Sequence, residues 1–169
     1  MKPHHLLFLC TGNSARSILA EAYLNSVGRG LYTAHSAGSH PAGRVHAQAI
    51  DLLKQRGIAT TALRSKSWDE FVRPGAPQFD FIFTVCDNAA GETCPVWPGQ
   101  PLSAHWGIAD PAAATGTDED RRRAFARAFD ELSMRIDLFL NLPIGQLDRH
   151  ALKKRLDQIG SAARKGEKR

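Results

Sequence analysis

The sequence predicts an α/β protein with a three-layer, doubly wound sheet of four parallel strands. Short apolar segments of strand length alternate along the chain with longer segments in which apolar residues recur at helical spacing. Strands separated by helices usually pair in parallel through right-handed crossovers. The 169 residues, 43% of them hydrophobic, can bury one core, and no repeat or low-complexity block interrupts them. We therefore expect one domain over residues 1–145, followed by a C-terminal helix and a basic, frayed tail over 146–169.

Four apolar or β-branched segments are expected to form the strands. The third has the strongest strand character, because aromatic and β-branched residues make it almost continuously apolar. The fourth is the weakest of them. The four segments cover residues 4–10, 31–36, 79–85 and 100–105.

Helices are expected between these strands and after the last one. Gly28 and Gly57 follow two of them and are suited to helix ends. Thr117 or Asp118 can cap the longest helix, and Pro143 ends it. The expected helices cover residues 16–27, 44–56, a short segment capped by Ser67, 118–141 and 145–160.

The chain carries 22 Lys and Arg against 17 Asp and Glu, and part of this excess lies within residues 153–169. A basic tail can bind nucleic acid, but no helix-turn-helix or interleaved aromatic residues accompany it, so we expect no nucleic-acid partner. No apolar run approaches the length of a membrane span, and the run at residues 6–9 is too short for a signal-peptide core. We therefore expect no membrane partner and a cytoplasmic location.

An unusual loop follows the first strand, at the edge where parallel sheets bind ligands. It starts at Cys10 and reaches Arg16 at the first helix. In so short a loop the backbone N–H groups can converge, and the helix N-terminus adds positive charge, so the loop can bind a tetrahedral oxyanion. Arg16 can hold two anion oxygens, and the same field is expected to lower the pKa of Cys10 and make it a nucleophile. The predicted oxyanion-binding residues are Thr11, Gly12, Asn13, Ser14, Ala15, Arg16 and Ser17.

The alternative is a buried thiol at a strand end, followed by a surface arginine. A nucleotide-binding P-loop is excluded because its Gly-x4-Gly-Lys pattern is missing. Residues 9–17, Leu-Cys-Thr-Gly-Asn-Ser-Ala-Arg-Ser, resemble the signature loop of the low-molecular-weight protein tyrosine phosphatases and of the arsenate reductases built on that fold. The resemblance, which covers about residues 5–141, implies a low-molecular-weight phosphatase-like fold. It also implies that Cys10 attacks phosphorus or arsenic and that Arg16 binds the oxyanion.

A second candidate segment, residues 105–111 (His-Trp-Gly-Ile-Ala-Asp-Pro), follows the fourth strand at the same edge. Asp110 can protonate an oxygen leaving group, and Pro111 keeps its backbone extended. An ordinary turn before proline is the alternative. The segment is similar to the arsenate reductase version of this loop. The phosphatases place tyrosines shortly after Asp-Pro, whereas this chain continues Ala-Ala-Ala-Thr-Gly, which disfavours a phosphotyrosine substrate.

The other cysteines, Cys86 and Cys94, follow the third strand. Buried structural thiols, or a metal site with His105, are alternatives, although the spacing matches neither zinc sites nor thioredoxin. The stretch resembles the redox segment of thioredoxin-linked arsenate reductases. This implies that Cys86 attacks the Cys10–arsenic adduct, that Cys94 then attacks the Cys10–Cys86 disulfide, and that a dithiol protein restores the thiols.

The resemblance also concerns a cation beneath the Cys10 loop. Arsenate reductases of Gram-positive type hold potassium there with an asparagine, a serine and an aspartate. Asn13 and Ser36 match the first two, and Lys66 aligns with the aspartate. The Lys66 ammonium is therefore expected to replace the ion and to donate to Asn13 and Ser36, the alternative being a solvated lysine. We expect no bound metal and no tightly bound cofactor.

The leading hypothesis is an arsenate reductase with a Cys10–Cys86–Cys94 relay and residual phosphatase activity. Its expected partners are arsenate and, as reductant, thioredoxin or alternatively glutaredoxin or glutathione. One rival is a small phosphatase acting on phosphotyrosine or another phosphomonoester. The other is a non-catalytic oxyanion or redox sensor.

Overall fold

The computed structural model describes residues 2–86, 95 and 97–165, with side chains up to residue 161. Its strands form one parallel sheet in the order β2-β1-β3-β4. The register places Leu6 of β1 between Ala34 of β2 and Phe81 of β3. This confirms the predicted parallel α/β fold. The strands are β1 (His4–Leu9), β2 (Tyr32–Ala37), β3 (Phe81–Thr84) and β4 (Leu102–His105).

The helices follow the predicted order, with limits that local caps explain. His46 caps α2, because its ring Nδ1 accepts a hydrogen bond from the Gln48 N–H, so this helix starts three residues later than expected. Thr117 forms a capping box with Asp120 at the start of α4. The helices are α1 (Arg16–Val27), α2 (Ala47–Gln55), α4 (Asp118–Leu140) and α5 (Arg149–Lys165), with 3-10 turns η1 (Trp68–Phe71), η2 (Pro111–Ala113) and η3 (Ile144–Gln146).

The prediction for the last helix, residues 145–160, is wrong at both ends. Residues 144–146 form the 3-10 turn η3 instead. The side chain of Asp148 accepts a hydrogen bond from the Ala151 N–H at 2.7 Å, which caps α5 at its observed start. The helix then continues to Lys165, so the segment expected to fray is helical up to that residue. The division of the chain at residue 145 stays a prediction.

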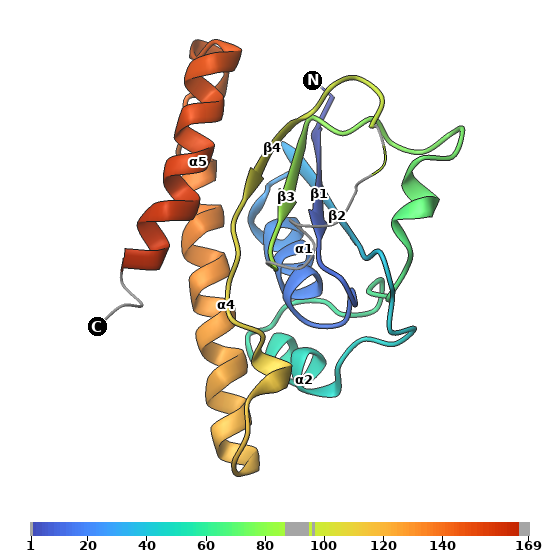
Figure 1. Cartoon of the computed structure of the whole chain (residues 1–169), viewed down its shortest axis with the longest axis vertical. Coiled ribbons are helices and arrows are strands. Elements are labelled where there is room, and N and C mark those ends of the chain that lie inside the picture. Colours follow the sequence, from blue (N-terminus) through green and yellow to red (C-terminus); the bar gives the residue numbers. More distant parts are fainter. Residues whose placement is uncertain (1, 87–94, 96, 166–169) are drawn as a thin grey trace.

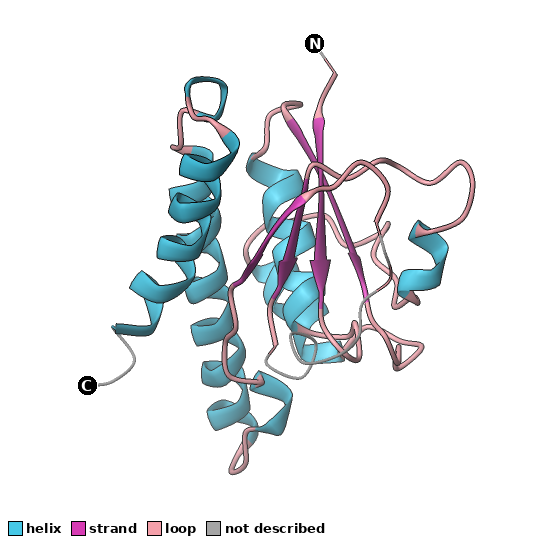
Figure 2. Cartoon of the chain, turned by 45° about the horizontal axis from the view of Figure 1, so that its top comes forward, coloured by secondary structure: helices cyan, strands magenta, loops and turns pink. Residues whose placement is uncertain are grey.

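The two faces of the sheet are covered differently (Figures 1 and 2). On one face, Leu6 and Phe8 join a large core with apolar side chains of α1, α2, α4 and α5. On the other face, Leu7 and Leu9 pack in a smaller cluster that Trp68 and other aromatic side chains cover. Successive side chains of a strand point to opposite faces, which explains this alternation in β1. The long helices therefore share one side, and η1 lies on the other (Figure 2).

The long helix α4 buries the stripe that its sequence predicts. Its predicted core residues are all buried, and α5 packs alongside it and against β4 (Figure 1). None of the helices within the described residues is long and apolar enough to cross a membrane. The predicted core residues of α4 are Phe125, Ala128, Phe129, Leu132, Ile136 and Phe139.

The parallel sheet brings three loops to one edge. Cys10 follows β1, Cys86 follows β3 and the loop with Asp110 follows β4. Backbone hydrogen bonds continue the sheet into these loops, from the Val85 N–H to the Leu9 carbonyl at 2.9 Å and from the Ile108 N–H to the Val85 carbonyl at 3.1 Å. The three candidate segments of the sequence therefore meet at the carboxyl ends of the strands.

Candidate active site

Asn13 fixes the shape of the loop that follows β1. It is fully buried, and its backbone φ of 46° lies in the left-handed region, which residues other than glycine rarely occupy. Its amide Nδ2 donates to the hydroxyl of Ser17 at 2.8 Å and to that of Ser36 at 3.0 Å. Its Oδ1 accepts from the backbone N–H of Lys66 at 2.8 Å. A strained backbone held by three hydrogen bonds is typical of a preorganised functional loop.

The carbonyl groups of the loop point away from its centre. Those of Thr11, Gly12 and Ser14 accept hydrogen bonds from the backbone N–H groups of residues 40, 42 and 46. A Cβ on Gly38 would lie 2.4 Å from the Thr11 carbonyl oxygen, so glycine is needed for this close approach. Within the described part of the chain, no side chain caps the start of α1. This orientation leaves the N–H side of the loop and the helix N-terminus for an anion.

Arg16 extends from the first turn of α1 toward the loop after β4. One guanidinium nitrogen, Nη1, donates to the carbonyl of Ile108 at 3.1 Å, and Nη2 lies 3.6 Å from Oδ2 of Asp110. The third nitrogen, Nε, is buried and has no hydrogen-bond partner among the described residues. A buried donor without a partner is costly in a folded protein. An oxyanion in the loop can accept a hydrogen bond from this Nε.

Cys10 and Cys86, which follow neighbouring strands, lie in contact. Both thiols are buried, and the Cys86 side chain lies within hydrogen-bonding range of the Cys10 thiol. The backbone N–H of Thr11 also donates to Sγ of Cys86 at 3.3 Å, which holds this cysteine against the loop. Cys94 lies outside the described residues.

The predicted fall in the pKa of Cys10 is wrong for this arrangement. The hydrogen bond with Cys86 raises the pKa of the Cys10 thiol, and burial raises it further. Arg16 and the Gly12 N–H lower it, but by less.

Lys66 lies in a buried polar cluster beneath the loop. It is 8% exposed, and its Nζ donates to the Arg64 carbonyl at 2.8 Å and to the Ser36 hydroxyl at 3.5 Å. The predicted donation from this ammonium to Asn13 is wrong, since the backbone N–H of Lys66 makes that contact. Nζ also lies 3.8 Å from Oε1 of Glu21, and the hydroxyl of Ser36 donates to the same oxygen.

Glu21 is a site residue that the sequence reasoning missed. It is 9% exposed, and burial raises its pKa while Lys66 and Ser36 act in the opposite direction. Burial likewise lowers the pKa of Lys66. An acidic residue three positions after Ile18, beside the apolar stripe of α1, was the available signal.

Asp110 stands at the start of η2. Its Oδ1 accepts from the Ala112 N–H at 3.0 Å and its side chain is 41% exposed, so Oδ2 is accessible to a ligand held by Arg16. A cavity of about 370 Å³ opens beside it. Besides Asp110, its charged lining residues are Asp120, Arg123, Arg127 and Glu131. None of residues 10–17 lines it, so this cavity lies beside the oxyanion loop rather than within it.

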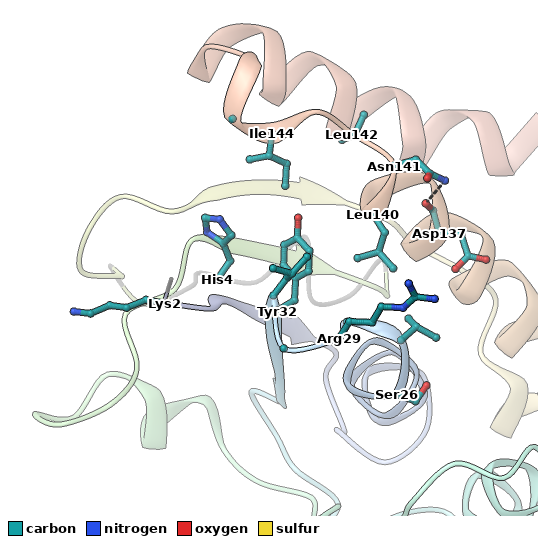
Figure 3. A pocket seen from close by; sticks show the side chains of 15 residues that line it. Lys2, His4, Ser26, Arg29, Tyr32, Asp137, Leu140, Asn141, Leu142 and Ile144 are labelled. Carbon is teal, nitrogen blue, oxygen red and sulfur yellow. Dashed lines mark hydrogen bonds between the residues drawn. The ribbon is translucent and has the colours of Figure 1, made fainter.

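Figure 3 shows a larger cavity, of about 900 Å³, that none of these residues lines. His4 and Tyr32, which line it, begin β1 and β2, whereas Cys10 follows the end of β1. This cavity therefore lies where the strands begin, at the opposite end of the sheet from Cys10. Within the described residues, no group of three His, Cys, Asp or Glu side chains could hold a metal ion.

Comparisons with known proteins agree with this geometry. The model of the family described as low molecular weight phosphotyrosine protein phosphatase matches residues 5–156. An arsenate reductase from Halalkalibacterium halodurans is 37% identical over 134 residues, which are 79% of this chain and 93% of the relative.

Two solved structures share the fold. An arsenate reductase from Archaeoglobus fulgidus is 31% identical, with a TM-score of 0.58 over 78% of this chain and 98% of the other. A low-molecular-weight protein tyrosine phosphatase from T. tengcongensis is 24% identical, with a TM-score of 0.66 over 82% and 99% of the two chains. With the Cys10 loop and the order of its strands, these matches show that the chain belongs to the low-molecular-weight phosphotyrosine protein phosphatase family.

Proposed function

We propose that this protein is an arsenate reductase that converts arsenate to arsenite in arsenic detoxification. The observation that carries the proposal is the contact between Cys10 and Cys86 beside the oxyanion loop. A phosphatase needs only one thiol, the nucleophile, whereas a reductase needs a second thiol within reach of the first. The arsenate reductases among its relatives support the same activity.

The first step is a condensation between the Cys10 thiol and arsenate. The loop N–H groups and Arg16 hold the arsenate oxygens, and Cys10 sulfur attacks arsenic. An arsenic–sulfur bond forms and an arsenic–oxygen bond breaks. Asp110 protonates the departing oxygen, which leaves as water. The Cys10 thiol gives up its proton as this bond forms.

The second step is the reduction. The Cys86 thiol gives up its proton, and its sulfur attacks Cys10 sulfur. A disulfide forms, the electron pair of the arsenic–sulfur bond stays on arsenic, and the departing arsenite takes up a proton. Arsenic(V) thereby becomes arsenic(III), arsenite leaves, and the two thiols have supplied both electrons. Cys94 then attacks Cys86 and frees Cys10, leaving a Cys86–Cys94 disulfide.

An external dithiol is needed to reduce that disulfide. Thioredoxin is the proposed reductant, with glutaredoxin or glutathione as alternatives. A neighbour with the same fold, from Corynebacterium glutamicum, is described as thioredoxin-dependent, but its 20% identity supports the fold alone. A cytoplasmic location is part of the proposal, since the relay requires a reducing compartment.

The test measures arsenate-dependent NADPH oxidation with thioredoxin and thioredoxin reductase, and in parallel with glutaredoxin and glutathione. Hydrolysis of p-nitrophenyl phosphate is measured on the same preparation. We expect arsenate turnover in the parent and none with Cys86→Ala, which should keep its aryl phosphatase activity. Aryl phosphate hydrolysis without any arsenate turnover would instead support a phosphomonoesterase.

A further inference from the structure

The C-terminal helix α5 is docked on the beginning of the loop that carries Asp110. Trp106 of this loop is fully buried, and its indole stacks on Phe83 with ring centroids 3.9 Å apart. The indole Nε1 donates to the Leu156 carbonyl of α5 at 3.0 Å. Helix α5, which is far from Cys10 in sequence, therefore holds Trp106, four positions before Asp110.

Gly160 lets α5 approach the loop backbone directly. A Cβ at this position would lie 2.5 Å from the His105 carbonyl oxygen and 3.1 Å from Cδ1 of Trp106. Real Cβ atoms essentially never come as close as 2.5 Å to a backbone oxygen. Any side chain at residue 160 must therefore move the helix and the loop apart.

Arg135 of α4 holds the same loop from another side. It is fully buried, and its Nη1 donates to the carbonyls of Trp106 at 2.6 Å and Gly107 at 3.0 Å. The next residue, Ile108, donates its N–H to Val85 and accepts from Arg16. Every residue from 106 to 108 is thus anchored, and Asp110 follows two positions later.

We propose that Gly160, Trp106 and Arg135 are positioning residues for Asp110. Helix α5 thereby supports the active site by holding the loop that carries Asp110. The inference rests on the proposed function, because it assigns these residues to the step in which Asp110 protonates the leaving oxygen. A shift of about 1 Å in a catalytic group can cost about a hundredfold in rate. The anchors keep Asp110 opposite Arg16.

Gly160→Ala tests the proposal, with Gly145→Ala as the matched control. Alanine favours a helix more than glycine does, so a loss of activity cannot come from a weaker α5. A Cβ at Gly145 would meet nothing within 4 Å. We expect Gly160→Ala to lower kcat for arsenate reduction about tenfold or more, and Gly145→Ala to leave it unchanged. Equal kcat in the two variants would overturn the proposal.

A double-mutant cycle with Asp110→Asn separates positioning from general damage to the fold. If Gly160 acts through Asp110, Gly160→Ala has no further effect on kcat once Asp110 is Asn, whereas a merely structural loss is additive. If Gly160→Ala does not fold, the same cycle is measured with Trp106→Phe, which keeps an aromatic ring but removes the indole N–H. Additive losses in either cycle would overturn the proposal.

The same measurements distinguish failure of this inference from failure of the proposed function. If the parent reduces arsenate but both cycles are additive, only the positioning role is wrong. If the parent hydrolyses aryl phosphates but does not reduce arsenate, the proposed function is wrong. The cycles are then measured as kcat for phenyl phosphate hydrolysis, because this leaving group also needs a proton. A parent without either activity contradicts both.

Discussion

Lys66→Ala is expected to lower the melting temperature by about 6–12 °C. Nζ of Lys66 lies 3.8 Å from Oε1 of Glu21, which corresponds to an attraction of about 4 kcal/mol at an effective dielectric constant of about 20. The variant also loses the hydrogen bond to the Arg64 carbonyl. The variant also avoids the cost of dehydrating the ammonium on folding, which offsets part of these losses. We therefore expect the free energy of unfolding to fall by about 3 kcal/mol, as is typical when one partner of a buried ion pair is removed. In a chain of this size, each 1 kcal/mol shifts the melting temperature by about 2–4 °C.

The loss should depend on pH with a definite sign. Burial raises the pKa of Glu21, and Lys66 is the largest influence that lowers it, so the variant raises this pKa further. A carboxyl with a higher pKa in the folded than in the unfolded state stabilises the fold as it takes up a proton. The difference in melting temperature between parent and variant should therefore be larger near about pH 8 than near about pH 5.

The assay is thermal unfolding followed by circular dichroism, in potassium and in sodium chloride at equal ionic strength. The parent should unfold at the same temperature in both salts, whereas the variant should regain stability in potassium. Lys154→Ala, at an exposed position on α5, is the control and should unfold like the parent. An unchanged melting temperature in Lys66→Ala would refute the stabilising role of the contact between Lys66 and Glu21. Strong activation of the parent by potassium would show that the ammonium does not replace the ion.

The remaining predictions concern the three cysteines. Cys10→Ser should lose all turnover but still bind arsenate in calorimetry, because the loop and Arg16 remain; a serine variant that turns over would remove Cys10 from its role. Cys86→Ala should let iodoacetamide alkylate Cys10 at lower pH than in the parent, because it removes the hydrogen bond that most raises the Cys10 pKa. Peptide mapping that shows the same pH dependence would contradict this. Cys94→Ala should accumulate a Cys10–Cys86 disulfide after one turnover, and full steady-state activity would exclude the relay.

Patterns within short stretches predicted most of the fold and the position of the site. The strand limits moved by at most two residues, and the three loops meet because parallel strands end at one edge. Capping decided the helix limits that moved, as the Asp148 side chain shows at α5. Such side-chain to backbone contacts depend on rotamers that periodicity does not report.

The parts that could not be predicted depend on contacts between distant residues. The pKa of Cys10 follows from Cys86, which only the folded sheet brings beside it. The Lys66 alignment located the right cluster, but it could not tell the backbone N–H from the ammonium or show that Glu21 completes the pair. The role proposed for Gly160 depends on a backbone contact that no pattern of side chains indicates.

The docking of α5 has a second consequence, which concerns the outer edge of the sheet. β4 is an edge strand, and its backbone offers unpaired groups to any other extended chain. Lys153 of α5 donates to the Ser103 carbonyl at 2.6 Å, and Arg149 donates to the Gln100 carbonyl at 2.7 Å. Lys153 thus occupies an acceptor of β4 that an incoming strand would need, and Arg149 occupies one that lies two residues before the strand. We therefore expect a chain shortened before α5 to expose this edge to strand addition and to self-associate.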